Sequence, residues 1–297
     1  MNIIGVCHLI RKANDLQAFK KFLASYKSHP AGIDHDLILV FKGFPNTHVP
    51  AEYSALLESV SYIPLFVGDR GFDLGSYFTA SKRLKHDYLC FLNSYSVILT
   101  DDWLAKMSCR IIEPQVGIVG ATASYESVYS YFVDMFANPD PLALPSRYLW
   151  RRIGGRILRQ NTLYRFRKIH DPFPNYHIRT NAFMISRQLM LSLKRKPFRR
   201  KWDALMFESG RNSLTKQILA LGLQTLVVGR DGSAYQKENW WQSWTFRSGT
   251  QENLLIADNR TEEYLNFSEA EKELFCGRSW GKDRISLLVN GKYLESQ

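Results

Sequence analysis

The stretches Gly71-Phe-Asp-Leu-Gly-Ser-Tyr77 and Tyr88-Leu-Cys-Phe-Leu-Asn-Ser-Tyr-Ser96 decide the fold. The first predicts a glycine-marked turn that leads into a helix. The second predicts a buried strand with polar residues just past its end, after which residues 97–104 return the chain to a helix. Because ligands of open α/β sheets lie at the carboxyl ends of strands, we expect a binding site beside these polar residues.

The chain around these stretches alternates strand and helix. Short apolar runs predict strands at 3–6, 37–41, 62–67, 88–92 and 116–119, and helical spacing predicts helices at 16–26, 51–60, 75–86 and 101–109. Pro64 in the third run favours an edge or irregular strand. This alternation predicts an α/β fold with a mostly parallel sheet and helices on both faces.

Composition and length describe a globular protein with an anionic partner. The 297 residues are 45% hydrophobic and 13% aromatic, which suits one large domain or a domain with an appendage. The net charge of +11 predicts a nucleotide diphosphate, a membrane surface or a nucleic acid as partner. Four scattered cysteines without a CxxC pair favour a reducing compartment. With no leader pattern and no bilayer-length apolar run, we expect a protein that is soluble or lies on a membrane.

A basic segment at about 145–170 interrupts the alternation. It carries eight Arg and Lys residues between 147 and 168 without an acidic residue, interleaved with Trp150 and several leucines and isoleucines. One interpretation is an interfacial helix on anionic lipid, where each basic residue contributes about 1 kcal/mol. The alternative is a basic helix that folds against the domain with its arginines in solvent. In the first interpretation, a second basic cluster at 194–201 extends the same face.

Two further motifs follow the basic segment. His177-Ile-Arg-Thr-Asn-Ala-Phe-Met-Ile-Ser-Arg187 predicts an apolar strand flanked by polar groups. Met206-Phe-Glu-Ser-Gly-Arg211 then leads into a helix, and 225–228 predicts a closing strand. We expect a main domain over 1–230 and an extension over 231–297 that packs on it.

These motifs resemble those of nucleotide-sugar-dependent glycosyltransferases of the GT-A type. The Gly71–Tyr77 stretch and Phe91-Leu-Asn-Ser94 are similar to runs in family 2-like and rhamnan-synthesis-type proteins, which build bacterial surface polysaccharides. The resemblance covers about residues 1–230. It implies a Rossmann-like GT-A fold and transfer of a sugar from a nucleotide-sugar donor to a glycan or lipid-linked acceptor, in the cytoplasm on the inner face of the membrane. The competing class is a non-catalytic protein that binds nucleic acid or an anionic polymer, but no nucleic-acid-binding motif supports it.

The resemblance also implies where the donor binds. In similar proteins the turn holds the nucleotide, and polar residues follow the next strand. Carried onto this sequence, the donor-binding residues are Asp69, Arg70, Asp73, Gly75, Asn93, Ser94 and Tyr95. Two of them have other interpretations: Asp73 as the cap of a helix near Gly75, and Arg70 as a solvated turn residue.

The strand of a GT-A protein normally ends in an Asp-x-Asp that holds a metal, whereas here it ends in Asn93-Ser94-Tyr95. An amide and a phenol are poor ligands for Mg²⁺ or Mn²⁺, so we assign no metal ligand, although a divalent metal remains an option. Either arginine or lysine neutralises the diphosphate without a metal, or Asp101 and Asp102 serve instead. The two aspartates equally suit a helix N-terminus. A non-catalytic relative is the third alternative.

Glycosyl transfer needs a carboxylate that deprotonates the acceptor hydroxyl. The resemblance places this base at the junction before a helix, where similar proteins have Glu-Asp and this chain has Glu208-Ser209. Glu208 as base implies inversion; its alternative is a carboxylate that complements a helix N-terminus. We expect acceptor or diphosphate contacts from His177, Arg179, Asn181, Arg211 and Arg247, with a structural role as the alternative for His177.

Overall fold

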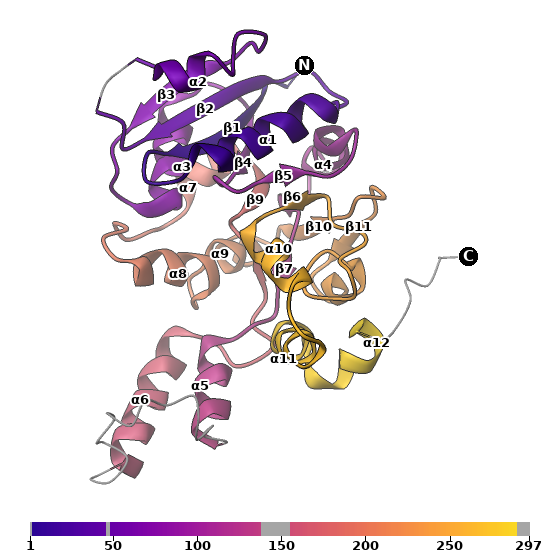
Figure 1. Ribbon diagram of the computed structural model, residues 1–297. Coiled ribbons are helices and arrows are strands. Elements are labelled where there is room, and N and C mark those ends of the chain that lie inside the picture. Colours follow the sequence, from indigo (N-terminus) through magenta and orange to yellow (C-terminus); the bar gives the residue numbers. More distant parts are fainter. Residues whose placement is uncertain (1, 46–47, 138–154, 290–297) are drawn as a thin grey trace.

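The computed structural model describes residues 2–45, 48–137 and 155–289 (Figure 1). Its centre, in this part of the chain, is a sheet of eight strands in the order β11-β10-β6-β9-β4-β1-β2-β3. The strands are β1 (Ile4–Arg11), β2 (Asp36–Lys42), β3 (Ile63–Val67), β4 (Tyr88–Leu92), β6 (Val116–Gly120), β9 (Ala182–Ser186), β10 (Gln224–Val228) and β11 (Ala234–Gln236).

Most of the sheet is parallel. Strands β1 to β4 run parallel to one another, and β6 is parallel to β10, whereas β9 is antiparallel to both β4 and β6. The last strand, β11, is antiparallel to β10. This arrangement confirms the predicted α/β fold class, a mostly parallel, Rossmann-like sheet flanked by helices. Strand β3 lies at the edge, which confirms the position that Pro64 predicted.

Helices cover both faces of the sheet (Figure 1). One core packs α1 (Leu16–Ser28), α2 (Ala51–Ser54) and α4 (Trp103–Ile111) against the sheet. The other packs α3 (Phe72–Arg83), α7 (Arg187–Ser192), α8 (Lys201–Ser209) and α9 (Leu214–Ala220). Side chains of β1 alternate between the two cores, because successive strand residues point to opposite faces.

Several predicted boundaries were wrong. Helix α3 begins at Phe72 and not near Gly75, and α2 ends at Ser54, well short of the expected residue 60. The apolar strand flanked by polar groups that was expected within 177–187 is β9, and a second short strand, β8 (His177–Ile178), precedes it, separated by Arg179, Thr180 and Asn181. These three residues turn the chain from the small sheet formed by β7 (Ala123–Ser124) and β8 into the central sheet.

Residues after 230 are packed against the earlier part of the chain. Strand β12 (Ile256–Ala257) pairs with β5 (Val97–Ile98), while α10 (Asn259–Leu265), α11 (Glu269–Trp280) and α12 (Ile285–Val289) follow. Trp240 and Trp280 are fully buried, and both lie against Tyr125. The boundary at residue 230 remains a prediction.

Two helices stand apart from the sheet. Figure 1 shows α5 (Val128–Ala137) and α6 (Gly155–Ile169) side by side at the lower end of the molecule, and Phe132 stacks on Phe166 with ring centroids 4.2 Å apart. No residue of α5 is buried, although its sequence is strongly apolar. Residues 145–154 of the expected basic segment, including Trp150, lie outside the described residues. Within the described ranges, no helix has both the length and the apolar character needed to cross a bilayer.

Candidate functional site at the carboxyl edge of the sheet

Charged residues end the first two strands of the parallel sheet. Arg11 is the last residue of β1, and Lys42 is the last residue of β2, paired with Arg11 in the strand register. Asp69 follows β3 and Asn93 follows β4. The carboxyl ends of adjacent parallel strands meet at one edge of the sheet, so these residues share that edge.

Lys42 attaches this edge to the glycine-marked turn. Its side chain is fully buried, and its ammonium donates hydrogen bonds of 3.0 Å to the carbonyl oxygens of Arg70 and Phe72. Burial lowers the pKa of Lys42, an effect opposed by the negative charges of Asp69 and Asp73. The turn and the start of α3 are therefore held by a cation that belongs to the sheet.

The glycines of the turn have a steric function. Gly71 has a φ of +86°, which favours glycine, and a Cβ on it would lie 3.0 Å from the Cα of Gly75. A Cβ on Gly75 would lie 3.2 Å from the Arg70 carbonyl oxygen. The two glycines thus let the turn pack closely on the first turn of α3. Gly75 therefore contributes to the site by allowing this close backbone packing.

Asp73 lies in the first turn of α3, where it is half-buried. The N-cap of the helix is Gly71, so the alternative interpretation of Asp73 as the cap was wrong. Burial raises the pKa of Asp73, and nearby Glu208 adds to the increase, whereas Arg11 and Lys42 oppose it. The Asp73 carboxyl group therefore interacts electrostatically with the cations Arg11 and Lys42 and with the acid Glu208.

Asp69 and Arg70 differ from Asp73 because both are exposed. The Asp69 side chain lies over Gly43 at the end of β2, where a Cβ would come within 3.2 Å of its Cγ. The Arg70 side chain forms no hydrogen bond or ion pair with the described residues, and the residue contributes its carbonyl oxygen to Lys42. The Asp69 side chain thus lies in solvent at the carboxyl edge of the sheet, while Arg70 stabilises the turn through its backbone carbonyl oxygen.

Glu208 lies in the last turn of α8, not at a helix start as predicted. Its Oε1 accepts a hydrogen bond from the Thr180 amide at 2.8 Å and another from the Thr180 hydroxyl at 3.2 Å. The alternative role at a helix N-terminus is therefore also wrong, since the next helix, α9, is capped by Ser213. Glu208 is fixed to the segment between β8 and β9 and lies within electrostatic reach of Asp73.

His177 lies in the small β7–β8 sheet, is buried, and is within electrostatic reach of Glu208. Its Nδ1 donates to the Asn175 carbonyl oxygen at 2.8 Å, because a carbonyl only accepts. Burial lowers the pKa of His177, while the nearby Glu208 charge opposes this change. The structure thus brings His177 and Glu208 together.

Asn93, Ser94 and Tyr95 form a local turn. The Asn93 side-chain oxygen accepts from the Tyr95 amide at 3.0 Å and from the Ser96 hydroxyl at 3.1 Å, and Tyr95 is exposed. Since this oxygen already has two donors, the position does not fit a metal ligand. The described residues contain no group of three or more His, Cys, Asp or Glu suited to a metal ion.

Asp101 and Asp102, the alternative metal ligands, lie beside His29 and Gly32 respectively. Asp102 is at the N-cap position of α4, but its side chain makes no capping hydrogen bond.

Several buried polar atoms at the carboxyl edge have no hydrogen-bond partner among the described residues. They are Arg11 Nε, Tyr77 Oη, Ser94 Oγ and Asn181 Nδ2. Asn181 is bonded to Asn93, whose backbone amide donates to the Asn181 carbonyl oxygen at 2.8 Å. The side-chain oxygen of Asn181 accepts a hydrogen bond from the Thr122 hydroxyl at 2.8 Å. Buried polar groups normally have partners. A polar ligand at this edge would supply them.

The three predicted anion-binding arginines are already paired with carboxylates. Arg179 lies 2.9 Å from buried Asp258, Arg211 lies 2.9 Å from Asp171, and Arg247 lies 3.2 Å from Glu126. Arg179 and Arg247 also stack on Phe246. Burial lowers the pKa of Arg247, and the Glu126 charge opposes this change. Their charges are thus largely neutralised within the fold.

Three residues of the site were missed in the sequence: Arg11, Lys42 and Thr180. The sequence does carry a signal for the first two, because each is a basic residue at the end of a largely apolar run. Thr180 carried no signal, since its contact with Glu208 spans 28 positions.

The sequence matches no protein-family model and no curated protein. Among solved structures, it is similar to the mannosyltransferase PcManGT from Pyrobaculum calidifontis in complex with GDP-Man and Mn²⁺, with 12% identity over 96% of this chain and 73% of that chain, and a TM-score of 0.46. Two structures of S. aureus TarS also match at 12% identity over 40% of this chain. They cover 34% and 21% of the TarS chains with TM-scores of 0.31 and 0.32. Similarity at this level does not show an activity for this chain.

Proposed function

We propose that this protein is a glycosyltransferase that moves a sugar from a nucleotide-sugar donor to a growing surface polysaccharide or a lipid-linked oligosaccharide. The observation that carries the proposal is a group of charged residues at the carboxyl edge of a GT-A-like sheet, in which Asp73 lies within electrostatic reach of Arg11, Lys42 and Glu208. The group combines what transfer requires: a carboxylate for the acceptor proton and a cation for the leaving diphosphate.

In this proposal the nucleotide-sugar donor binds between the Gly71 turn and the carboxyl ends of the sheet strands. Asp69 and Asp73 accept hydrogen bonds from the nucleoside, while Ser94 and Asn181 offer unpartnered polar atoms to the sugar or phosphates. Arg11 is the cation for the diphosphate, because its guanidinium forms no salt bridge with the described residues and its Nε lacks a partner there. Lys42 is occupied by two carbonyl oxygens and acts through the turn. Arginine suits phosphate because its planar donors bind two oxygens at once.

Glu208 is the general base of the proposed reaction. It takes the proton of an acceptor hydroxyl as that oxygen bonds to the anomeric carbon, and the bond from this carbon to the diphosphate oxygen breaks. The nucleoside diphosphate leaves with the electron pair, and Arg11 stabilises its added charge. Attack opposite the leaving group inverts the anomeric configuration. No step is assigned to a metal, because the donors at Asn93–Tyr95 do not fit one.

In this proposal the protein lies in the cytoplasm on an anionic membrane surface, where it meets its acceptor. The α5–α6 pair supports it, since no residue of apolar α5 is buried and its Tyr131 is exposed, while α6 adds exposed Arg165, Arg167 and Lys168. Aromatic and basic side chains together suit the interface of anionic lipid. Sedimentation with phosphatidylserine vesicles should recover the protein, and phosphatidylcholine vesicles should not; equal recovery would contradict this location.

The competing class, a non-catalytic anion-binding protein, predicts a continuous groove of available arginines. Arg179, Arg211 and Arg247 are instead paired with carboxylates, which favours the transferase. Calorimetric titration of UDP, GDP, CMP and dTDP, each with Mn²⁺ or with EDTA, tests the proposal. We expect one nucleotide to bind at micromolar concentration in EDTA. Absence of binding by all four nucleotides under both conditions would contradict the transferase.

A further inference from the structure

A cavity of about 410 Å³ lies at the opposite edge of the sheet from Glu208. It is bounded by the last turn of α1, by the start of β2 and by the segment that leads into β3. The seven residues of β2 separate this edge from Lys42, which corresponds to roughly 20 Å of extended chain. The cavity has the volume of a small-molecule site and is distinct from the proposed donor site.

One wall carries a hydrogen-bonded pair with a defined proton arrangement. His35 Nδ1 lies 3.0 Å from the Ile33 carbonyl oxygen, so this nitrogen carries the proton. His35 Nε2 lies 2.8 Å from the Tyr26 hydroxyl and, in the neutral ring, accepts its hydrogen bond. The Tyr26 oxygen then keeps an acceptor site.

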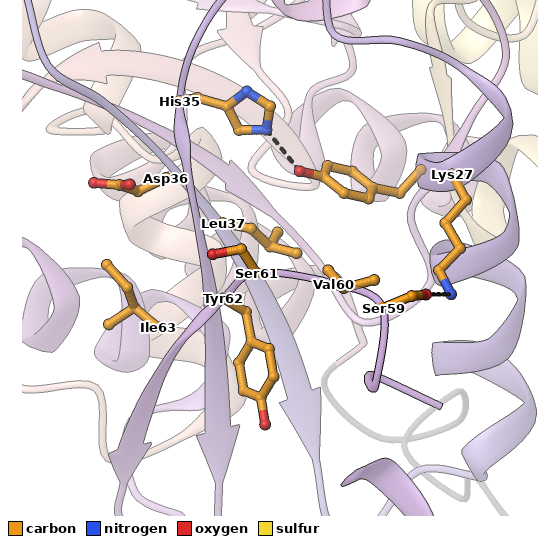
Figure 2. Close-up of a pocket in the computed structure, with 10 residues that line it drawn as sticks. Lys27, His35, Asp36, Leu37, Ser59, Val60, Ser61, Tyr62 and Ile63 are labelled. Carbon is orange, nitrogen blue, oxygen red and sulfur yellow. Dashed lines mark hydrogen bonds between the residues drawn. The ribbon is translucent and has the colours of Figure 1, made fainter. Parts of the chain in front are cut away.

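The facing walls carry one cation and one anion. Lys27 donates to the Ser59 hydroxyl at 3.1 Å, which leaves two ammonium protons and the Ser59 proton for a ligand. Asp36 accepts from His86 with one carboxylate oxygen at 2.9 Å, and within the described residues its other oxygen has no hydrogen bond. Figure 2 shows the Lys27–Ser59 bond on one side of the cavity and Asp36 with Ile63 on the other.

The charge balance identifies the ligand class. Lys27 and Asp36 carry opposite charges, so the lining has no formal net charge, although the whole chain carries +11 when both are counted with neutral histidines. A phosphate would gain from Lys27 but face Asp36, so the cavity is not built for an anion. Leu37, Val60 and Ile63 add apolar surface between the polar groups. A neutral ring with hydroxyls on its rim and C–H groups on its faces matches such a lining.

We propose that this cavity binds a neutral saccharide unit, with Asp36 accepting from sugar hydroxyls and Lys27 and Ser59 donating to them. The site is an accessory carbohydrate site that holds a part of a glycan away from the reacting end. Its proposed ligand class follows from the cavity alone and goes beyond the transfer reaction.

Amide NMR spectra recorded during titration with glucose, galactose, mannose, rhamnose or N-acetylglucosamine test the proposal, with inorganic phosphate as the anionic probe. We expect one saccharide to shift the amides of residues 35–37 and 59–63 at millimolar concentration. Asp36→Ala and Lys27→Met should each raise its dissociation constant at least about tenfold. Ser61→Trp, which fills the cavity without touching either charge, should also weaken binding.

Lys20→Met, an exposed change on the same helix, and Asp73→Asn at the donor edge should leave saccharide binding unchanged. The proposal is overturned if no saccharide shifts these amides, if phosphate shifts them instead, or if the cavity variants bind as the wild type does. Nucleotide calorimetry on the three cavity variants keeps the two proposals separate, because loss of the saccharide site leaves nucleotide binding intact.

Discussion

Glu208 and Thr180 are joined by two hydrogen bonds, from the threonine amide at 2.8 Å and from its hydroxyl at 3.2 Å, both to the same carboxylate oxygen. One oxygen of Glu208 is thus fixed by the segment before β9, and the other has no hydrogen bond within the described residues. A carboxylate fixed in this way keeps one oxygen oriented for proton transfer.

Glu208→Gln should abolish sugar transfer and leave nucleotide binding unchanged. The amide keeps the shape of the side chain but cannot take a proton, and loss of a general base costs about 10²–10⁴-fold in rate. Radiolabelled sugar transfer measures the rate, and calorimetry measures nucleotide affinity. Glu263→Gln, an exposed change on α10, is the control and should transfer normally. An active Glu208→Gln protein would remove the base assignment.

Thr180→Val should lower kcat about tenfold with little change in KM for the donor. It removes the hydroxyl bond to Glu208 but keeps the amide bond, and a hydrogen bond to a charged group contributes about 1.5–3 kcal/mol. Thr180→Ser retains the hydroxyl and should recover most of the activity. Equal rates for Val and Ser would show that the hydroxyl does not position the base.

Arg11→Met should weaken binding of the nucleoside diphosphate about 10–100-fold, because a charge-assisted contact to phosphate is lost. Binding of the bare nucleoside, which carries no phosphate, should change much less. Calorimetry with both ligands measures the difference. Lys12→Met removes a neighbouring exposed charge and is the matched control. A uniform loss for both ligands would place Arg11 away from the diphosphate.

His8 makes the stability of the protein depend on pH. It is fully buried and stacked on Phe22, its ring nitrogens lack partners among the described residues, and burial lowers its pKa from 6.5 to about 3. Below pH 6.5 the unfolded chain binds a proton that the folded chain does not, so stability decreases by about 1.4 kcal/mol per pH unit from this residue.

His8→Leu should therefore flatten the acid side of the stability profile by that amount, as measured by urea unfolding between pH 6.5 and the acid limit of reversibility. His170 and His177 also have lowered pKa values and contribute with the same sign, so a residual slope remains in the variant. Parallel profiles for the two proteins would show that His8 titrates normally in the fold.

The sequence predicted the order of strands and helices in residues 1–120 because buried parallel strands are continuous apolar runs and their helices have clear spacing. It could not predict that β9 would enter the sheet between β4 and β6, since this pairing joins distant segments. The start of α3 was misplaced because Gly71 takes the N-cap position without a side-chain cap, and no capping residue marks it.

At the site, Asn93 directly follows β4 as expected, whereas Asp73 and Glu208 lie at other positions in their helices than the sequence suggested. The binding and catalytic roles of these residues stay predictions. Glu208 was placed at a helix start because Gly210 suggested a junction, but the next helix, α9, begins at Leu214 and is capped by the Ser213 hydroxyl. The pairs Arg179–Asp258 and Arg247–Glu126 span 79 and 121 positions, so their mutual neutralisation was invisible in the chain.

The attachment of Lys42 to the carbonyl oxygens of Arg70 and Phe72 has a thermodynamic consequence for any ligand at this edge. The turn is already ordered by a buried side chain of the sheet, so binding there carries little further loss of conformational entropy from the loop. Affinity at this edge is then set by the contacts themselves. The heat capacity change on binding should be small, because the surface that a folding loop would bury is already covered.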